Sequence, residues 1–127
     1  MLQQLDGNVF CVDWSTVAAD PLYFPVVPLT QTVGQMIGHF ITRLVAATGV
    51  SLNDVHLIGH SMGAHVVGFA GGSLAPNKVA QISGLDPAGP GYGDGQPRLS
   101  KDDAQLVVCT HTSSGIDYEG CMTRIIF

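Results

Sequence analysis

The chain has 127 residues, of which 46% are hydrophobic and 12% are charged. This composition excludes a disordered chain, which needs low hydrophobicity and high charge, and the length allows one domain at most. The net charge of −5 argues against nucleic acid as a partner. The first residues lack the basic and apolar regions of a signal peptide, and no apolar run reaches the roughly 20 residues that cross a bilayer.

The first third of the sequence predicts a strand and a helix. The segment "NVFCVDW", Asn8 to Trp14, is apolar and β-branched with little alternation, which is typical of a strand covered on both faces. A loop with the sequence "DPLYFPVVP" follows. From Leu29 to Thr48 apolar residues recur at spacings of three and four, and Gly49 comes next. This pattern predicts an amphipathic helix that ends at the glycine.

The remaining elements alternate between strands and helices. Short apolar runs predict strands from Asp54 to Gly59, from Lys78 to Pro87 and from Ala104 to Thr112. The segment "SMGAHVVGFAGG" predicts a helix after the first of these, and the Gly- and Pro-rich stretch from Ala88 to Pro97 predicts a surface loop. Alternating strands and helices favour a parallel, doubly wound α/β sheet.

The sequence "GHSMG" fits the pattern G-x-S-x-G and places Ser61 between the predicted strand and the predicted helix. In that position the hydroxyl is exposed above the edge of the sheet, and Gly59 and Gly63 would give it clearance. The start of the helix directs its N–H groups to the same place, so Met62 N–H is a candidate donor to an oxyanion. The alternative is that Ser61 only caps the helix.

Asp86 closes the strand that follows the predicted nucleophile helix. Neighbouring parallel strands end at one edge of a sheet, so Asp86 is expected beside Ser61. The order serine then aspartate agrees with a catalytic acid that orients a later histidine. The residues alone equally allow an Asp-Pro turn.

His111 follows Ser61 and Asp86 in the chain and closes the last predicted strand. In a complete enzyme it would be the general base by elimination.

The other histidines are weaker candidates for that role. His60 lies inside the motif, and His65 lies one turn beyond Ser61 on the helix, so neither is expected to take a proton from the serine. His56 and His60 are four residues apart but lack the glutamate of a zinc protease motif. His39 is expected at a packing boundary of the long helix.

Three cysteines, Cys11, Cys109 and Cys121, are too few and too scattered for a disulfide framework or a zinc site. A bridge between Cys109 and Cys121 is compatible with an oxidising compartment.

Two stretches, "VHLIGHSMGAHVVGFAG" and "ISGLDPAGPGY", resemble the animal pancreatic-lipase family, especially its insect neutral-lipase branch. The resemblance extends from about Asn8 through His111. It implies that the protein is secreted and has an α/β-hydrolase fold, which is a mostly parallel sheet with helices on both faces. It also implies hydrolysis of carboxyl esters of glycerolipids at a lipid interface, by a triacylglycerol lipase or a phospholipase A1-like enzyme without a cofactor.

The resemblance also assigns roles to residues of this sequence. It implies that Ser61 is the nucleophile, Asp86 the triad acid and Met62 N–H one oxyanion donor. It also implies that His111 is not the general base, because the family's catalytic histidine lies beyond residue 127. The family's oxyanion loop lies upstream of this sequence. We therefore expect residues 1–127 to be a single partial lipase domain, incomplete at both ends, without the family's C-terminal β-sandwich domain and inactive in isolation.

Two further expectations follow from the resemblance. Arg98 and Asp103 match ligand-bearing positions of a calcium site in some relatives, but Gly95 and Ser100 replace acidic ligands there, so no metal is expected. The alternative to an esterase is a non-catalytic lipid-binding protein, of the kind used as a yolk or carrier protein.

Overall fold

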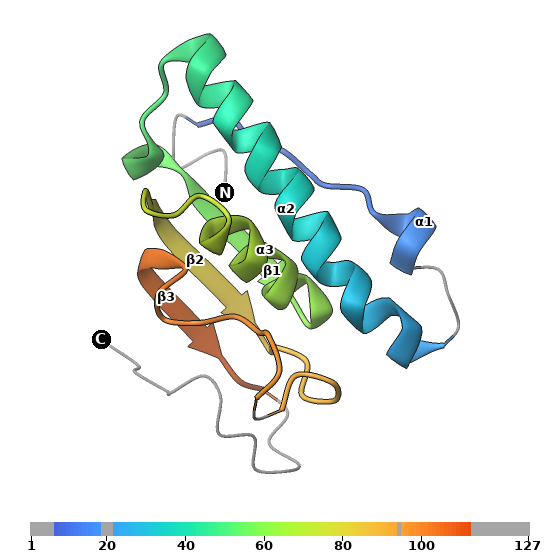
Figure 1. Cartoon of the computed structure of the whole chain (residues 1–127). Coiled ribbons are helices and arrows are strands. Elements are labelled where there is room, and N and C mark those ends of the chain that lie inside the picture. Colours follow the sequence, from blue (N-terminus) through green and yellow to red (C-terminus); the bar gives the residue numbers. More distant parts are fainter. Residues whose placement is uncertain (1–6, 19–21, 94, 113–127) are drawn as a thin grey trace.

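The computed structural model describes residues 7–18, 22–93 and 95–112, and in this part of the chain helices α2 and α3 accompany a parallel sheet. The strands form one sheet in the order β1-β2-β3. Helix α3 lies against the sheet, and α2 packs along α3 (Figure 1). The elements in chain order are α1 (Ser15–Ala18), α2 (Tyr23–Thr48), the 3₁₀ turn η1 (Leu52–Asp54), β1 (His56–His60), α3 (Met62–Gly72), β2 (Val79–Leu85) and β3 (Ala104–Thr110).

The predicted parallel α/β architecture is confirmed. The second, third and fourth predicted strands correspond to β1, β2 and β3, and the predicted helix after the motif corresponds to α3. His60 pairs with Leu85, and Leu85 pairs with Thr110. The three strands therefore end at the same edge of the sheet, so the residues after them lie side by side.

The predicted strand from Asn8 to Trp14 is wrong, because no strand forms there. Val9 and Phe10 are exposed, and the Phe10 ring meets the ring of Phe40 on α2 edge-on, with centroids 5.4 Å apart. A β-branched run becomes a strand only when another strand supplies backbone partners. Within the described residues, no strand lies beside β1 on the side away from β2.

Helix α2 begins at Tyr23, six residues before the expected start, so most of the expected proline loop is helical. Pro25 lies in the first turn, where a backbone N–H has no acceptor within the helix, and a proline there loses no hydrogen bond. The end is as predicted: Gly49 adopts φ 73° and its N–H donates to Val45 O. No helix in the described part of the chain has both the length and the apolar character to cross a membrane.

Helices α2 and α3 approach closely at glycines. A Cβ atom at Gly34 would lie 2.5 Å from Phe69 Cβ and 2.6 Å from Val66 O, and one at Gly38 would collide with Ser73 Oγ. The close contact leaves α3 between α2 and the sheet, which explains why its residues are buried on nearly every side.

The core lies between α3 and the sheet. Its fully buried members include Ala64, Val79 and Ile82. Cys109 is also buried and is disulfide-bonded, whereas Cys11 is exposed and free. The predicted bridge pairs Cys109 with Cys121, which lies outside the described residues.

The opposite face of the sheet has no helix over it within the described residues. Ile58, Leu85 and Leu106 project there and are 45%, 41% and 43% exposed. An exposed apolar patch on a sheet promotes association or the binding of another surface.

We expect the double variant Ile58→Lys/Leu106→Lys to bind less of a fluorescent hydrophobic dye and to scatter less light than the unmodified chain at equal concentration. The control Ile82→Thr changes a fully buried residue of β2 and should increase dye binding by loosening the core. Unchanged dye binding and scattering in the double variant would show that this face is not the associating surface.

Candidate active site

Ser61 occupies a strained turn between β1 and α3. Its backbone has φ 54° and ψ −123°, a conformation that costs a non-glycine residue about 1–3 kcal/mol. The turn is held by the Ser61 N–H, which donates to Leu85 O at 2.9 Å. Ser61 stands at the N-cap of α3, but its side chain makes no capping hydrogen bond. The structure therefore disfavours the alternative that this serine is only a helix cap.

The two glycines of the motif have different roles. A Cβ atom at Gly59 would collide with Gly63 O and lie 2.8 Å from Ala64 N, whereas a Cβ atom at Gly63 would meet nothing within 4 Å. Clearance was expected from both glycines, but the described residues require it only of Gly59. A side chain at position 59 would push the start of α3 away from the end of β1.

This difference gives a paired prediction. Gly59→Ala should destabilise the chain by about 3 kcal/mol, because the added methyl group meets backbone atoms that cannot move independently. Gly63→Ala should be neutral or stabilising by about 0.5–1 kcal/mol, because alanine favours a helix and has open space there. Urea unfolding at low micromolar concentration measures both changes, and equal destabilisation by the two variants would contradict this geometry.

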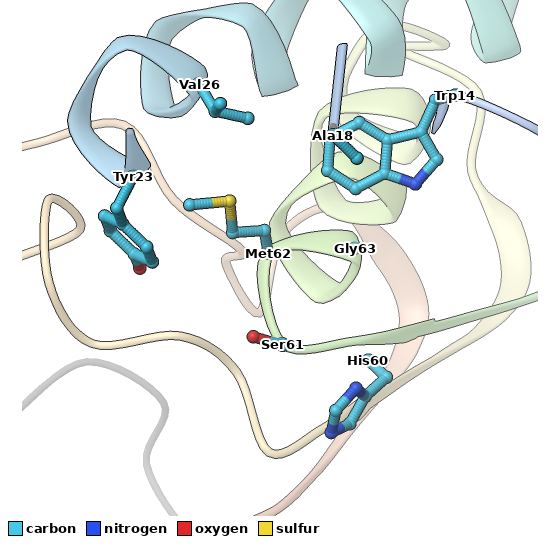
Figure 2. A pocket seen from close by; sticks show the side chains of 8 residues that line it. All are labelled: Trp14, Ala18, Tyr23, Val26, His60, Ser61, Met62 and Gly63. Carbon is cyan, nitrogen blue, oxygen red and sulfur yellow. The ribbon is translucent and has the colours of Figure 1, made fainter. Parts of the chain in front are cut away.

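Helix α3 directs its first N–H groups to the Ser61 turn. The helix begins at Met62, and the first N–H groups of a helix have no acceptors within it. They carry the positive end of the helix dipole, which favours negative charge nearby. Figure 2 shows the Ser61 hydroxyl on the open side of the turn and the Met62 side chain between it and Val26.

A cavity of about 370 Å³ opens beside the Ser61 turn (Figure 2). Its wall is largely apolar, so it suits a hydrocarbon group next to the hydroxyl. The residues around it come from the N-terminal segment, α1, α2 and the motif, and are Trp14, Ala18, Tyr23, Val26, His60, Ser61, Met62 and Gly63.

Asp86 follows β2 as Ser61 follows β1, so the register places the two residues on adjacent strands at one edge. Asp86 also has a positive φ, 46°. Its N–H donates to Thr110 O at 2.6 Å, and its Oδ1 accepts the Thr112 N–H at 3.1 Å. The segment after β3 therefore holds the carboxylate from one side.

His111 lies on the far side of Asp86 from Ser61. It follows β3, and strands about 4.8 Å apart put the ends of β1 and β3 about 10 Å from each other. A triad imidazole contacts the hydroxyl with one nitrogen and the carboxylate with the other, so it lies between them. The strand order Ser61, Asp86, His111 thus supports the expectation that His111 is not the base.

Three other histidines are also not placed to act as the general base. In Figure 2 the His60 ring lies below the end of β1, and the Ser61 hydroxyl extends to the left of the turn. His56 Nε2 lies 2.8 Å from Ser83 Oγ, and burial lowers the pKa of this histidine. His39 is exposed on α2. Within the described residues, no group of three His, Cys, Asp or Glu side chains could hold a metal ion.

His65 has a structural position that the sequence patterns did not reveal. It is only 4% exposed, its Nδ1 accepts the Leu99 N–H at 3.1 Å, and its Nε2 lies 2.8 Å from Ala88 O. Because a carbonyl only accepts, Nε2 carries the proton. The ring stacks on Tyr92, with centroids 3.6 Å apart. These partners are distant in sequence, so no local spacing signals them.

Burial shifts the pKa values of His65 and Asp103 in opposite directions. Burial lowers the pKa of His65 to about 4 and raises the pKa of Asp103 to about 6. The Asp103 carboxylate accepts the Ser100 N–H at 2.7 Å and lies close to the glycines of α3. Arg98 donates to Tyr92 O at 3.2 Å. Arg98 and Asp103 thus both contribute to the packing of this loop.

These shifts predict the pH dependence of stability. The unfolded chain binds the His65 proton more tightly, so His65 costs stability as pH falls from about 6.5 to 4. The folded chain binds the Asp103 proton more tightly, so Asp103 adds stability as pH falls from about 6 to 4. We expect Asp103→Asn to expose the His65 effect, with a loss of about 3 kcal/mol in the free energy of unfolding between pH 6.5 and 4.

Urea unfolding at these two pH values measures this dependence. The unmodified chain should change less than Asp103→Asn, because its two effects nearly cancel. In His65→Gln only the Asp103 effect remains, so the free energy of unfolding should rise as pH falls, opposite to the change in Asp103→Asn. The same pH dependence in Asp103→Asn and the unmodified chain would contradict the assignment.

The sequence of the chain is similar to those of known lipases. The sequence model of the family "Lipase" matches residues 1–123. Over 110 residues the chain is 44% identical to lipoprotein lipase of Homo sapiens and 46% identical to that of Gallus gallus. Each of these alignments covers 84% of this chain and 22% of the relative. Over 108 residues it is 45% identical to hepatic triacylglycerol lipase of Mus musculus, which covers 83% of this chain and 21% of that relative.

The chain therefore spans about a fifth of the length of the curated relatives it matches. With the family match extending over nearly all of its residues, the chain belongs to the lipase family, in its pancreatic-lipase group.

Proposed function

We propose that residues 1–127 are part of a lipase domain and contribute the nucleophile, the acid and one oxyanion donor of a serine ester hydrolase. The observation that carries the proposal is the strained Ser61 turn, which lies next to Asp86 at one sheet edge and beside an apolar cavity. A serine on a strained turn from a strand into a helix is typical of the nucleophile in hydrolases with the G-x-S-x-G pattern. The relatives named as lipases support the same reaction class.

In this mechanism Ser61 Oγ attacks the ester carbonyl while a histidine takes its proton. The Met62 N–H donates to the oxyanion that forms, and Asp86 orients the histidine and stabilises its imidazolium. The histidine then protonates the leaving alcohol, and an acyl-serine remains. Water, deprotonated by the same histidine, hydrolyses the acyl-serine and releases a fatty acid.

The cavity supports a lipid ester as the substrate class. Trp14, Val26 and Met62 in its wall suit an acyl chain. The substrate is a glycerolipid ester, taken from a lipid interface by a triacylglycerol lipase or a phospholipase A1-like enzyme.

The base is not supplied by residues 1–127. The sequence has five histidines, and none of them lies between Ser61 and Asp86: His65 is fixed by Ala88 and Leu99, and His111 is two strands from Ser61. Without its histidine a triad keeps only a small residual rate. The 127-residue polypeptide is therefore inactive by itself.

An extracellular location agrees with this function. Cys109 is disulfide-bonded, and disulfides persist in oxidising compartments.

Hydrolysis of a lipid ester distinguishes the proposed hydrolase from the lipid-binding alternative. The test protein, called the extended protein below, is residues 7–112 continued at both ends by the corresponding segments of one of the matched lipases. It should release fatty acid from an emulsion of trioleoylglycerol or from phospholipid vesicles. Binding of the same lipids without release of fatty acid would favour the lipid-binding alternative.

A further inference from the structure

We propose that His65 is a positioning residue that fixes Asp86 relative to Ser61, by anchoring the backbone that follows the acid to the helix that follows the nucleophile. The inference rests on the proposed function and assigns a role to a side chain that takes no part in proton transfer.

A short path through His65 connects the two candidate catalytic residues. His65 lies four residues after Ser61, one turn along α3. Its Nε2–H donates at 2.8 Å to Ala88 O, two residues after Asp86. Pro87 lies between Asp86 and Ala88 and restricts the backbone there. A displacement of Ala88 is therefore transmitted to Asp86.

The same ring holds the far end of the loop. Leu99 N–H donates to His65 Nδ1 at 3.1 Å, and Leu99 is only 2% exposed. The chain between Ala88 and Leu99 is rich in glycine and proline and has no helix or strand within its described residues. One imidazole thus anchors both ends of a loop that lacks regular structure of its own.

Tyr92 packs on one face of the His65 ring and connects it to helix α2. Tyr92 stacks on His65, and the Tyr92 hydroxyl lies 3.0 Å from Thr30 Oγ1. Thr30 Oγ1 donates to Val27 O at 2.6 Å, so the tyrosine hydroxyl donates to the threonine. The network satisfies every buried polar group in it, and among the described residues no buried side-chain nitrogen or oxygen atom is without a partner.

Only a neutral imidazole meets both demands at this position. It donates from one nitrogen and accepts at the other, at opposite sides of a rigid ring. The amide of glutamine can reach Ala88 O as a donor, and the oxygen of asparagine can accept the Leu99 N–H. Each amide therefore replaces one of the two bonds, which separates the anchor near Asp86 from the anchor at Leu99.

Kinetics of the extended protein test the proposal. His65→Asn, which loses the bond to Ala88 O, should lower kcat about 100-fold with little change in KM, as expected for a misplaced catalytic group. His65→Gln, which keeps that bond, should recover most of the loss. The acid limb of the pH profile should move to lower pH in His65→Asn, because a displaced Asp86 raises the pKa of the catalytic histidine less. His39→Asn is the matched control, because His39 is exposed on α2 and outside this network, and it should leave kcat unchanged.

Hydrogen exchange followed by mass spectrometry tests the anchor in the 127-residue chain itself, without any need for catalysis. Peptides that cover residues 86–92 should exchange faster in His65→Asn than in His65→Gln. Equal loss of kcat in the two variants, an unmoved acid limb, or unchanged exchange would overturn the positioning role. Absence of hydrolysis by the unsubstituted extended protein would instead count against the proposed function, and the exchange experiment would still decide whether His65 anchors this segment.

Discussion

Replacement of Ser61 by alanine is expected to lower kcat for ester hydrolysis by the extended protein by about 10⁶-fold. The variant lacks the oxygen that attacks the carbonyl, so no acyl-serine forms, while the oxyanion donors and the cavity remain. Folding should be unaffected or slightly improved, because the Ser61 side chain makes no capping bond and its removal leaves no buried group unpaired. Fatty-acid release from the same emulsion measures the effect.

Ser51→Ala is the matched control. The Ser51 hydroxyl accepts the Asn53 N–H at 3.1 Å in the exposed η1 turn, away from the cavity. Its loss should cost about 1 kcal/mol of stability and leave kcat unchanged. Retention of more than a hundredth of the activity in Ser61→Ala would mean that another residue is the nucleophile.

Asp86→Asn is expected to lower kcat about 10⁴-fold. The amide keeps the size of the side chain and an oxygen that can accept the Thr112 N–H. It removes the negative charge that stabilises the imidazolium and holds the histidine in the wrong tautomer. The effect should therefore appear in kcat, whereas KM and the free energy of unfolding should change little.

Asp102→Asn controls for the loss of one negative charge. Asp102 is exposed and pairs with Lys101 at 3.3 Å on the surface, so its replacement should have no measurable effect on kcat. A decrease of less than tenfold in Asp86→Asn would support the Asp-Pro turn interpretation, in which this residue only shapes the chain after β2.

Local patterns predicted most of what surrounds the candidate site. The apolar runs before Ser61 and before Asp86 are short and end in polar residues, which suffices to mark the ends of two strands. Because parallel strands end at a common edge, the sequence also predicted that these two side chains lie side by side. The register of His60 with Leu85 confirms that the two residues follow adjacent strands at that edge.

Features that depend on distant partners could not be predicted in this way. Asn8 to Trp14 has the composition of a strand, but a strand also needs a neighbour, and none lies beside it among the described residues. The pattern G-x-S-x-G likewise treats its glycines as equivalent, although only Gly59 faces a backbone collision. The role of His65 depends on Ala88 and Leu99, which lie 23 and 34 residues farther along the chain.

The most direct test of this account is the reaction of Ser61 with a fluorophosphonate, mapped by mass spectrometry of the labelled peptide. The extended protein should be labelled at Ser61, because its flanks supply a histidine, and the 127-residue chain should not be labelled. An unlabelled Ser61 in the extended protein would contradict its role as nucleophile. Labelling of the short chain that disappears in His111→Ala would show instead that this chain carries its own base.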